Sequence, residues 1–107
     1  PYLFQNYRDM PSTLFQELFL YLDKNEYVVI PKTDENFQAV RYTLEHSGLD
    51  CILISPVKSE DNKMIGLLTT SWKDCNNSKV DELSIAKFIK YSKSDLVREA
   101  VITERDL

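Results

Sequence analysis

Glycine and histidine are scarce in this sequence, and their scarcity limits the chemistry that the chain can perform. The 2 glycines, Gly48 and Gly66, lie too far apart to form a glycine-rich phosphate loop. There is 1 histidine, and neither a GxSxG nor an HExxH motif occurs. We therefore expect a protein that is not an enzyme and that carries no cofactor.

Cysteine is equally rare. The 2 cysteines, Cys51 and Cys75, do not form a CxxC pair. Because a zinc site requires four closely spaced ligands and only His46 could join these two, we expect no metal site. The spacing permits a disulfide between Cys51 and Cys75 in an oxidising compartment and two thiols in a reducing one. Both alternatives stay open at this point.

An excess of positive charge and long apolar runs are also lacking. The formal net charge is −4 and the pI about 4.9. Since nucleic-acid binding usually needs a basic patch, we expect no nucleic-acid partner. No run of about 18 apolar residues occurs, so membrane contact would need a segment outside this sequence. The chain begins at Pro1, from which we expect a fragment of a longer protein, and the sequence leaves its compartment open.

Apolar residues are present in ordinary amounts. They make up 43% of the 107 residues, and charged residues make up 28%. This length and composition are typical of one soluble globular domain with a modest core. We expect a single domain over residues 1–107.

Local residue patterns predict helices and strands in a definite order. Residues 1–10 suit a short strand or a packed arm. Apolar residues at three- and four-residue spacing predict one helix over about 13–23 and a second that Gly48 closes. Runs rich in β-branched residues predict strands over 26–30, 49–57 and 63–72, and a last helix follows from Val80. The predicted fold is α/β (α+β), an antiparallel sheet with a central hairpin packed by helices.

Four finer expectations follow from the same patterns. Thr33 or Asp34 caps the second helix, and Gly66 marks a bulge or a close backbone approach. A hairpin turn centred near residues 60 and 61 places Cys51 opposite roughly Thr70. The last helix bends or breaks around residues 92–94. Its buried side is expected to contain Val80, Leu83, Ala86, Ile89, Leu96, Val97 and Ala100.

Aromatic residues and the histidine are the candidates for a binding site. Tyr27, Phe37, Tyr42 and Trp72 could line a small-molecule pocket, because such pockets are mostly apolar with a few polar groups. The competing interpretation is that these aromatic residues simply pack in the core or on the surface. His46 could contact a ligand or act as a base, but its place in the last turn of a helix also suits the helix dipole.

A series of local motifs runs through two thirds of the chain. The segment Glu26–Ile30 is a short β-branched strand, and a helix over Phe37–Gly48 follows it. An apolar strand, Leu49–Val57, ends in Ser-Pro-Val, and after a polar turn Met64–Trp72 contains Ile-Gly-Leu-Leu. The helix from Val80 completes the series. Together, residues 11–89 resemble the later part of a GAF domain.

This resemblance implies a sheet with packed helices, a small-ligand or chromophore pocket on one face, and dimerisation through terminal helices. The leading strands of a complete GAF domain are absent or reduced to residues 1–10. The function implied is that of a non-enzymatic sensory or regulatory domain that binds a small ligand, a protein partner or a second copy of itself. A cytoplasmic location would accompany a sensor module.

A looser resemblance leads to a different class of protein. An apolar strand with a serine and a proline, a polar turn and a strand ending in an aromatic residue occupy Ile54–Trp72, and a charged helix begins near Val80. This ending is similar to that of the periplasmic domains of T-even phage holins. The resemblance implies a periplasmic domain, anchored in the membrane by another segment, that controls lysis timing by binding an antiholin.

Overall fold

The computed structural model describes residues 3–6, 12–73 and 82–106 of the chain. This part contains four strands and four helices. In chain order they are β1 (Leu3–Asn6), α1 (Ser12–Lys24), β2 (Val28–Pro31), α2 (Gln38–Ser47), β3 (Cys51–Lys58), β4 (Met64–Trp72), α3 (Glu82–Ser92) and α4 (Asp95–Asp106). Each helix and strand predicted from the residue patterns is present. The predicted break near residues 92–94 is confirmed, because it separates α3 from α4.

The four strands form one antiparallel sheet in the order β1-β4-β3-β2. The long β3–β4 hairpin lies at its centre, with β1 paired to β4 and β2 paired to β3. Pro56 lies beyond Ile54, the last β3 residue that pairs with β2, so its missing N–H costs no pairing on that side. The predicted α/β (α+β) fold with a central hairpin is confirmed.

A β-bulge lies near the turn of the hairpin. Val57 pairs with Gly66, but the next β3 residue pairs with Met64, so Ile65 is an extra residue in β4. Because of this insertion, Ile65 and Leu68 face the same side of the sheet although they are three residues apart. The bulge predicted from the glycine is therefore confirmed next to Gly66.

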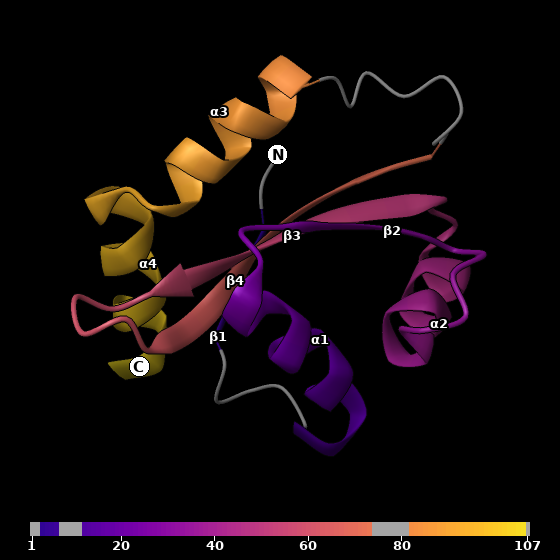
Figure 1. Ribbon diagram of the computed structural model, residues 1–107, viewed down its shortest axis with the longest axis horizontal. Coiled ribbons are helices and arrows are strands. Elements are labelled where there is room, and N and C mark those ends of the chain that lie inside the picture. Colours follow the sequence, from indigo (N-terminus) through magenta and orange to yellow (C-terminus); the bar gives the residue numbers. More distant parts are fainter. Residues whose placement is uncertain (1–2, 7–11, 74–81, 107) are drawn as a thin grey trace.

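Helices cover both faces of the sheet, α1 and α2 on one side and α3 and α4 on the other (Figure 1). On the first side, α1 presents apolar residues at one- and four-residue spacing, and α2 presents Val40 and Leu44. These side chains pack on alternate residues of the strands. The buried residues of this layer are Leu18, Phe19, Leu22, Val28, Ile30, Val40, Leu44, Ile54 and Leu67.

The second side of the sheet carries a separate apolar layer. Leu53 faces this side and Ile54 the other, as expected for neighbouring residues in a strand whose two faces are both covered. Partly buried residues such as Phe4 and Trp72 pack around its edge. The buried residues of this layer are Leu53, Val57, Leu68, Phe88, Val97 and Val101.

The predicted buried side of the last helix is wrong in part. Leu83 is 64% exposed and Leu96 is 70% exposed, and Ala86 is exposed as well. The prediction of Val97 is confirmed, but Phe88 rather than Leu83 anchors α3. Val80 lies outside the described residues. The reason is geometric, because the helix breaks into two and each half turns its own apolar residues to the sheet.

The second helix begins later than predicted. Its N-cap position is occupied by Phe37, which makes no side-chain capping hydrogen bond, so the prediction of a cap at Thr33 or Asp34 is wrong. Asp34 instead closes a local turn. Its Oδ1 accepts a hydrogen bond of 2.7 Å from the backbone N–H of Asn36, which gives the segment an alternative to helix.

The end of the second helix agrees with the prediction. Gly48 has a φ of 73°, in the left-handed region, and its backbone N–H donates to the carbonyl of Leu44. The backbone N–H of Leu49 donates to the same carbonyl at 3.2 Å. A residue without a Cβ adopts this φ at low cost, so the glycine ends α2 as expected.

The hairpin turn is displaced from its predicted position. The backbone N–H of Ser59 donates to the carbonyl of Lys63 at 2.8 Å, and Asn62 has a positive φ of 66°. The turn is therefore centred on Asp61. This displacement and the bulge each move the β4 partner of a β3 residue by one position.

The pairing of Cys51 changes as a consequence. It lies opposite Trp72, whereas the predicted turn places it opposite Thr70. The prediction is wrong because a turn residue in the left-handed region and an inserted strand residue leave little trace in the apolar pattern. The paired part of β4 thus extends two residues further toward Cys75 than expected.

Candidate functional site

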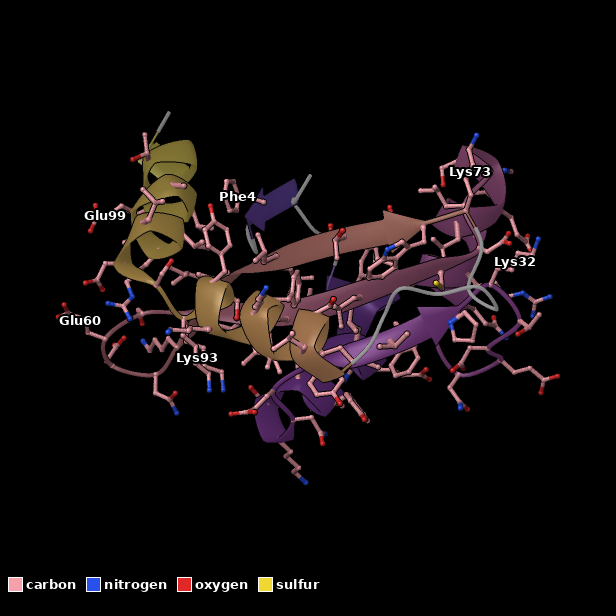
Figure 2. All side chains as sticks on the ribbon, turned by 90° about the horizontal axis from the view of Figure 1, so that it is seen from above. Phe4, Lys32, Glu60, Lys73, Lys93 and Glu99 are labelled. Atoms are coloured by element: carbon pink, nitrogen blue, oxygen red, sulfur yellow. The ribbon has the colours of Figure 1, made fainter. Side chains whose placement is uncertain are left out.

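A cleft lined almost entirely by residues with polar or charged side chains lies where the end of α1, the β3–β4 hairpin and the α3–α4 turn meet, and we call it the corner cleft. Glu60 on the hairpin turn and Lys93 on the α3–α4 turn lie at the same end of the molecule, away from Lys32 and Lys73 (Figure 2). The volume of the cleft is about 450 Å³, within the range of about 300–1,000 Å³ typical of small-molecule sites. Its lining consists of Asp23, Lys24, Asn25, Glu26, Ser55, Pro56, Lys58, Ser59, Asn62, Ser92, Lys93 and Arg98.

Two buried serines from different elements meet at this cleft. The Ser55 hydroxyl on β3 and the Ser92 hydroxyl at the end of α3 lie 2.8 Å apart. Ser55 also donates to the backbone carbonyl of Glu26 at 3.0 Å, and Ser92 is 2.7 Å from the carbonyl of Ile89. Each hydroxyl carries one proton, so the two serines can donate at most two hydrogen bonds among these three contacts. This network joins the α1–β2 connection, the sheet and α3 at one point.

Glu26 connects the same elements a second time through its side chain. Its Oε1 accepts a hydrogen bond and ion pair of 2.7 Å from the Nζ of Lys93, in the α3–α4 turn. The hydrogen bond from Lys93 is the main cause that lowers the pKa of Glu26, and the attraction of the Lys93 charge adds to it. Both side chains face solvent, so salt will screen this pair.

Lys93→Gln is expected to return the pKa of Glu26 toward its ordinary value. Folding lowers the pKa of Glu26, so the unfolded chain binds more protons than the folded chain in this pH range. The stability that the Glu26–Lys93 pair contributes is therefore present above the ordinary pKa of a glutamate. It is lost as the pH falls through the pKa of Glu26 in the folded chain. Titration of the Glu26 carboxyl carbon by NMR measures this change. Lys90→Gln, which removes a lysine of α3 near its end, is the control and should leave the pKa of Glu26 where it is. An unchanged pKa in Lys93→Gln would contradict the assignment.

Arg98 on α4 is held against the hairpin by several contacts. Its Nε donates to the backbone carbonyl of Lys58 at 3.1 Å, and its Nη1 donates to Asp95 at 3.0 Å. The Glu60 carboxylate lies 4.0 Å from the same Nη1. The Arg98 side chain is only 23% exposed. Its guanidinium therefore has a defined orientation at the edge of the cleft, and only part of its five donors is used in these contacts.

The aromatic residues predicted for a pocket are not gathered in one place, and none of them lines the corner cleft. Phe37 packs into the α1–α2 layer, with its ring edge-on to Tyr21 at 5.9 Å between centroids. Trp72 packs on the opposite layer. Tyr27 is 37% exposed in the α1–β2 connection. The structure thus separates these three residues, and their role in binding stays a prediction.

The remaining two predicted residues form a pair on the surface of α2. The rings of Tyr42 and His46 are edge-on, with centroids 4.0 Å apart. Tyr42 is 62% exposed and His46 is exposed as well. One turn of helix separates the two residues, so their contact follows from the helix itself. A role in ligand binding is not tested by this geometry.

Cys51 is fully buried at the start of β3 and is disulfide-bonded. Cys75, the other cysteine of the chain, lies outside the described residues. The pairing of Cys51 with Cys75 therefore stays a prediction. We expect it in protein produced in an oxidising compartment, because exposure to a reducing cytosol keeps such cysteines as thiols.

Intact-mass spectrometry tests this pairing. Protein produced in the periplasm of a bacterial host should be lighter by two hydrogen atoms than the same protein after reduction. Cys75→Ser should remove the difference, which makes it the matched control. Equal masses for the untreated and the reduced protein would rule out the disulfide.

The described part of the chain comprises residues 3–6, 12–73 and 82–106. Within these ranges, no cluster of three or more His, Cys, Asp or Glu side chains could hold a metal ion. None of the helices there combines the length and the apolar character that crossing a membrane requires.

Sequence reasoning did not find the residues of the corner cleft. Ser55 belongs to the Ser-Pro-Val motif, and no local pattern distinguishes Lys93 or Arg98. One signal was available, because a serine in an otherwise apolar strand is expected to have a partner when it is buried. The partner itself, Ser92, comes from a distant part of the chain.

No family model and no curated protein matches this sequence. Among solved structures, the chain is similar to the GAF domain of a two-component sensor histidine kinase from Bacillus halodurans, with a TM-score of 0.60 and 20% sequence identity. The match covers 89% of this chain and 63% of that one. This chain therefore spans less than two thirds of the length of the solved domain.

The similarity shows the fold. The expected GAF-like arrangement, with a central antiparallel hairpin between helices, is confirmed over most of the chain. The resemblance to the periplasmic domains of phage holins gains no support from these comparisons. The expectations of lysis control and membrane anchoring that rested on it therefore gain none either.

Proposed function

We propose that this chain is a non-catalytic, GAF-like sensory or regulatory domain that acts by binding a small ligand or a protein partner. The observation that carries the proposal is the GAF-like fold over 89% of the chain, similar to a domain of a two-component sensor histidine kinase. Fold alone does not determine function, and a binding domain also requires a binding site. The corner cleft supplies one.

The position of the corner cleft suits a regulatory role. A ligand there contacts the hairpin, the end of α1 and the α3–α4 turn at the same time. The second helical layer is joined to the sheet at this corner by the Ser55–Ser92 contact and the Glu26–Lys93 ion pair. A ligand changes the conformation of a protein only as far as it binds two states with different affinity. A ligand that contacts both layers binds with different affinity to two states in which the layers are arranged differently.

A thermal-shift screen of the purified chain against a library of small metabolites tests the ligand-binding form of the proposal. A ligand at about 100 times its Kd adds about 2.7 kcal/mol to the stability, which raises the Tm of a domain of this size by about 10 °C or more. The ligand should be recovered unchanged after incubation, as shown by mass spectrometry. Chemical conversion of the ligand would contradict the non-catalytic part of the proposal.

The partner-binding form of the proposal is supported by two exposed leucines, Leu83 on α3 and Leu96 on α4. Burial of either leucine against another protein surface, including that of a second copy of the chain, would be favourable because it removes apolar area from water. Analytical ultracentrifugation over a range of concentrations tests the homodimer. A dimer that is lost in Leu96→Glu supports this form, and a monomer at every concentration excludes the homodimer.

A further inference from the structure

The corner cleft is positively charged although the chain as a whole is acidic. Four cationic side chains and two carboxylates line it, so its walls carry a formal surplus of two positive charges. The complete chain has a net charge of −4. A concave surface with this local surplus attracts anions, because its low-dielectric walls concentrate the field.

The helix ends around the cleft reduce this surplus but do not cancel it. α1 ends at Lys24 and α3 at Ser92, and each negative helix end is equivalent to about half an elementary charge. The positive end of α4, which begins at Asp95, offsets one of them. The carboxylates of Asp95 and Glu60 approach Arg98 from solvent, with side chains 89% and 92% exposed, and they are not part of the lining.

Within the part of the chain that the structure describes, two of the four cations have no carboxylate partner. Lys93 pairs with Glu26, and Arg98 is oriented by its contacts with the hairpin. Among residues 3–6, 12–73 and 82–106, however, neither Lys24 nor Lys58 forms an ion pair. Lys24 lies in the last turn of α1, where its positive charge interacts favourably with the negative end of the helix dipole. Lys58 in β3 has no such explanation.

The shape and the polar groups of the cleft narrow the class of anion. A phosphate monoester carries a charge of about −1.5 to −2 at neutral pH, which matches the surplus, and it accepts several hydrogen bonds. Lysine, arginine and small polar donors such as Ser59 and Asn62 supply these bonds. The cleft volume of about 450 Å³ also leaves room for an organic group beside the phosphate.

From these observations we infer that the corner cleft binds a small organic phosphate, with Lys58 and Arg98 as its main cationic contacts. This inference rests on the proposed function only in that it names the ligand class of the same site. Lys58 and Arg98 come from the hairpin and from α4, and Arg98 donates to the Lys58 carbonyl. The ligand thus bridges the sheet and the second helical layer.

Amide NMR spectra of the chain titrated with glycerol 3-phosphate test the inference. We expect shifts in residues 55–62 and 92–98, and no shifts there with glycerol, which lacks the anion. Inorganic phosphate should shift the same amides more weakly, and succinate, a dicarboxylate, should bind at least about tenfold more weakly than glycerol 3-phosphate. Equal binding of succinate would overturn the phosphate class.

Lys58→Gln is the decisive variant, because the Lys58 side chain forms no ion pair with any described residue. The spectrum itself shows whether the fold persists. The loss of one charge-assisted contact should weaken the binding of glycerol 3-phosphate about tenfold. Lys87→Gln is the matched control, since Lys87 is an exposed lysine of α3 outside the cleft. It should leave the affinity within about twofold.

The outcomes separate this inference from the proposed function. Shifts confined to other surfaces, or an affinity that Lys58→Gln leaves unchanged, would overturn the inference. If glycerol 3-phosphate shifted no amide at the corner cleft while a neutral ligand bound elsewhere and survived unchanged, the inference would be overturned and a sensory role upheld. Glycerol 3-phosphate bound at the corner and hydrolysed there would uphold the site and overturn the non-catalytic function.

Discussion

Val97→Asp is expected to leave much of the chain unfolded at neutral pH. Val97 is fully buried in the layer between the sheet and α4, among apolar side chains that include Leu68 and Phe88. A carboxyl group there loses its hydration and finds no charged partner in this cluster, which costs about 4–5 kcal/mol or more. The total stability of a domain is only about 5–15 kcal/mol. Circular dichroism and urea denaturation measure the loss.

Leu96→Asp is the control for this variant, because it places the same carboxyl group one residue away. Leu96 is 70% exposed and lies in the first turn of α4. A negative charge near the start of a helix is favourable, so the stability should change by less than about 0.5 kcal/mol. If the two variants were destabilised equally, the orientation of α4 described above would be wrong.

Phe88→Ala is expected to lower the free energy of unfolding by about 3–5 kcal/mol, the range for large aromatic truncations in a core. Phe88 is only 1% exposed and is the largest fully buried side chain of the structure as described. It packs in one cluster with β3, β4 and α4, so its removal leaves a cavity that several elements share. The midpoint of urea denaturation measures this loss.

Leu83→Ala on the same helix provides the comparison for this truncation. It removes an apolar side chain of which 64% faces solvent. We expect a loss below about 0.5 kcal/mol. If Leu83→Ala cost as much as Phe88→Ala, then α3 would turn the side predicted from the sequence toward the sheet.

The elements whose patterns repeat within a few residues were predictable. Leu18 and Leu22 are one turn apart and mark the buried side of α1 without any information from the rest of the chain. The β3–β4 hairpin was predictable for the same reason, because two apolar runs and the polar turn between them are neighbours in sequence. The end of α2 at Gly48 was predictable because it depends on the local backbone geometry alone.

The orientation of α3 was not predictable from its residues. Leu83 and Phe88 are both large and apolar, and they lie on different sides of the helix. The side that faces the sheet also contains Ser92, which is buried but polar. The apolar pattern of α3 therefore ends before Ser92, although Ser92 belongs to the interface with the sheet. The Ser55 hydroxyl opposite it and the Ile89 carbonyl one turn earlier supply the partners that a buried serine needs at this position.

The corner cleft was beyond prediction for a related reason. Ser55 lies 29 residues after Glu26 and 37 residues before Ser92. No local motif joins these segments, and they meet only because the second helical layer crosses the sheet near the end of the hairpin. The β2–β3 register places the Glu26 segment beside Ser55, and the position of α3 on the sheet brings Ser92 to the same point.

The outer strand β2 has a consequence for how the molecule meets its neighbours. It contains only four residues, its last residue is Pro31, and Lys32 follows directly. An extended segment from another molecule would find a short border with one backbone donor missing and a charge beside it. Growth of the sheet from molecule to molecule is therefore disfavoured at this border. Contacts between copies at this edge therefore depend on side chains, whose complementarity is specific to a sequence. They do not depend on backbone groups, which every protein has.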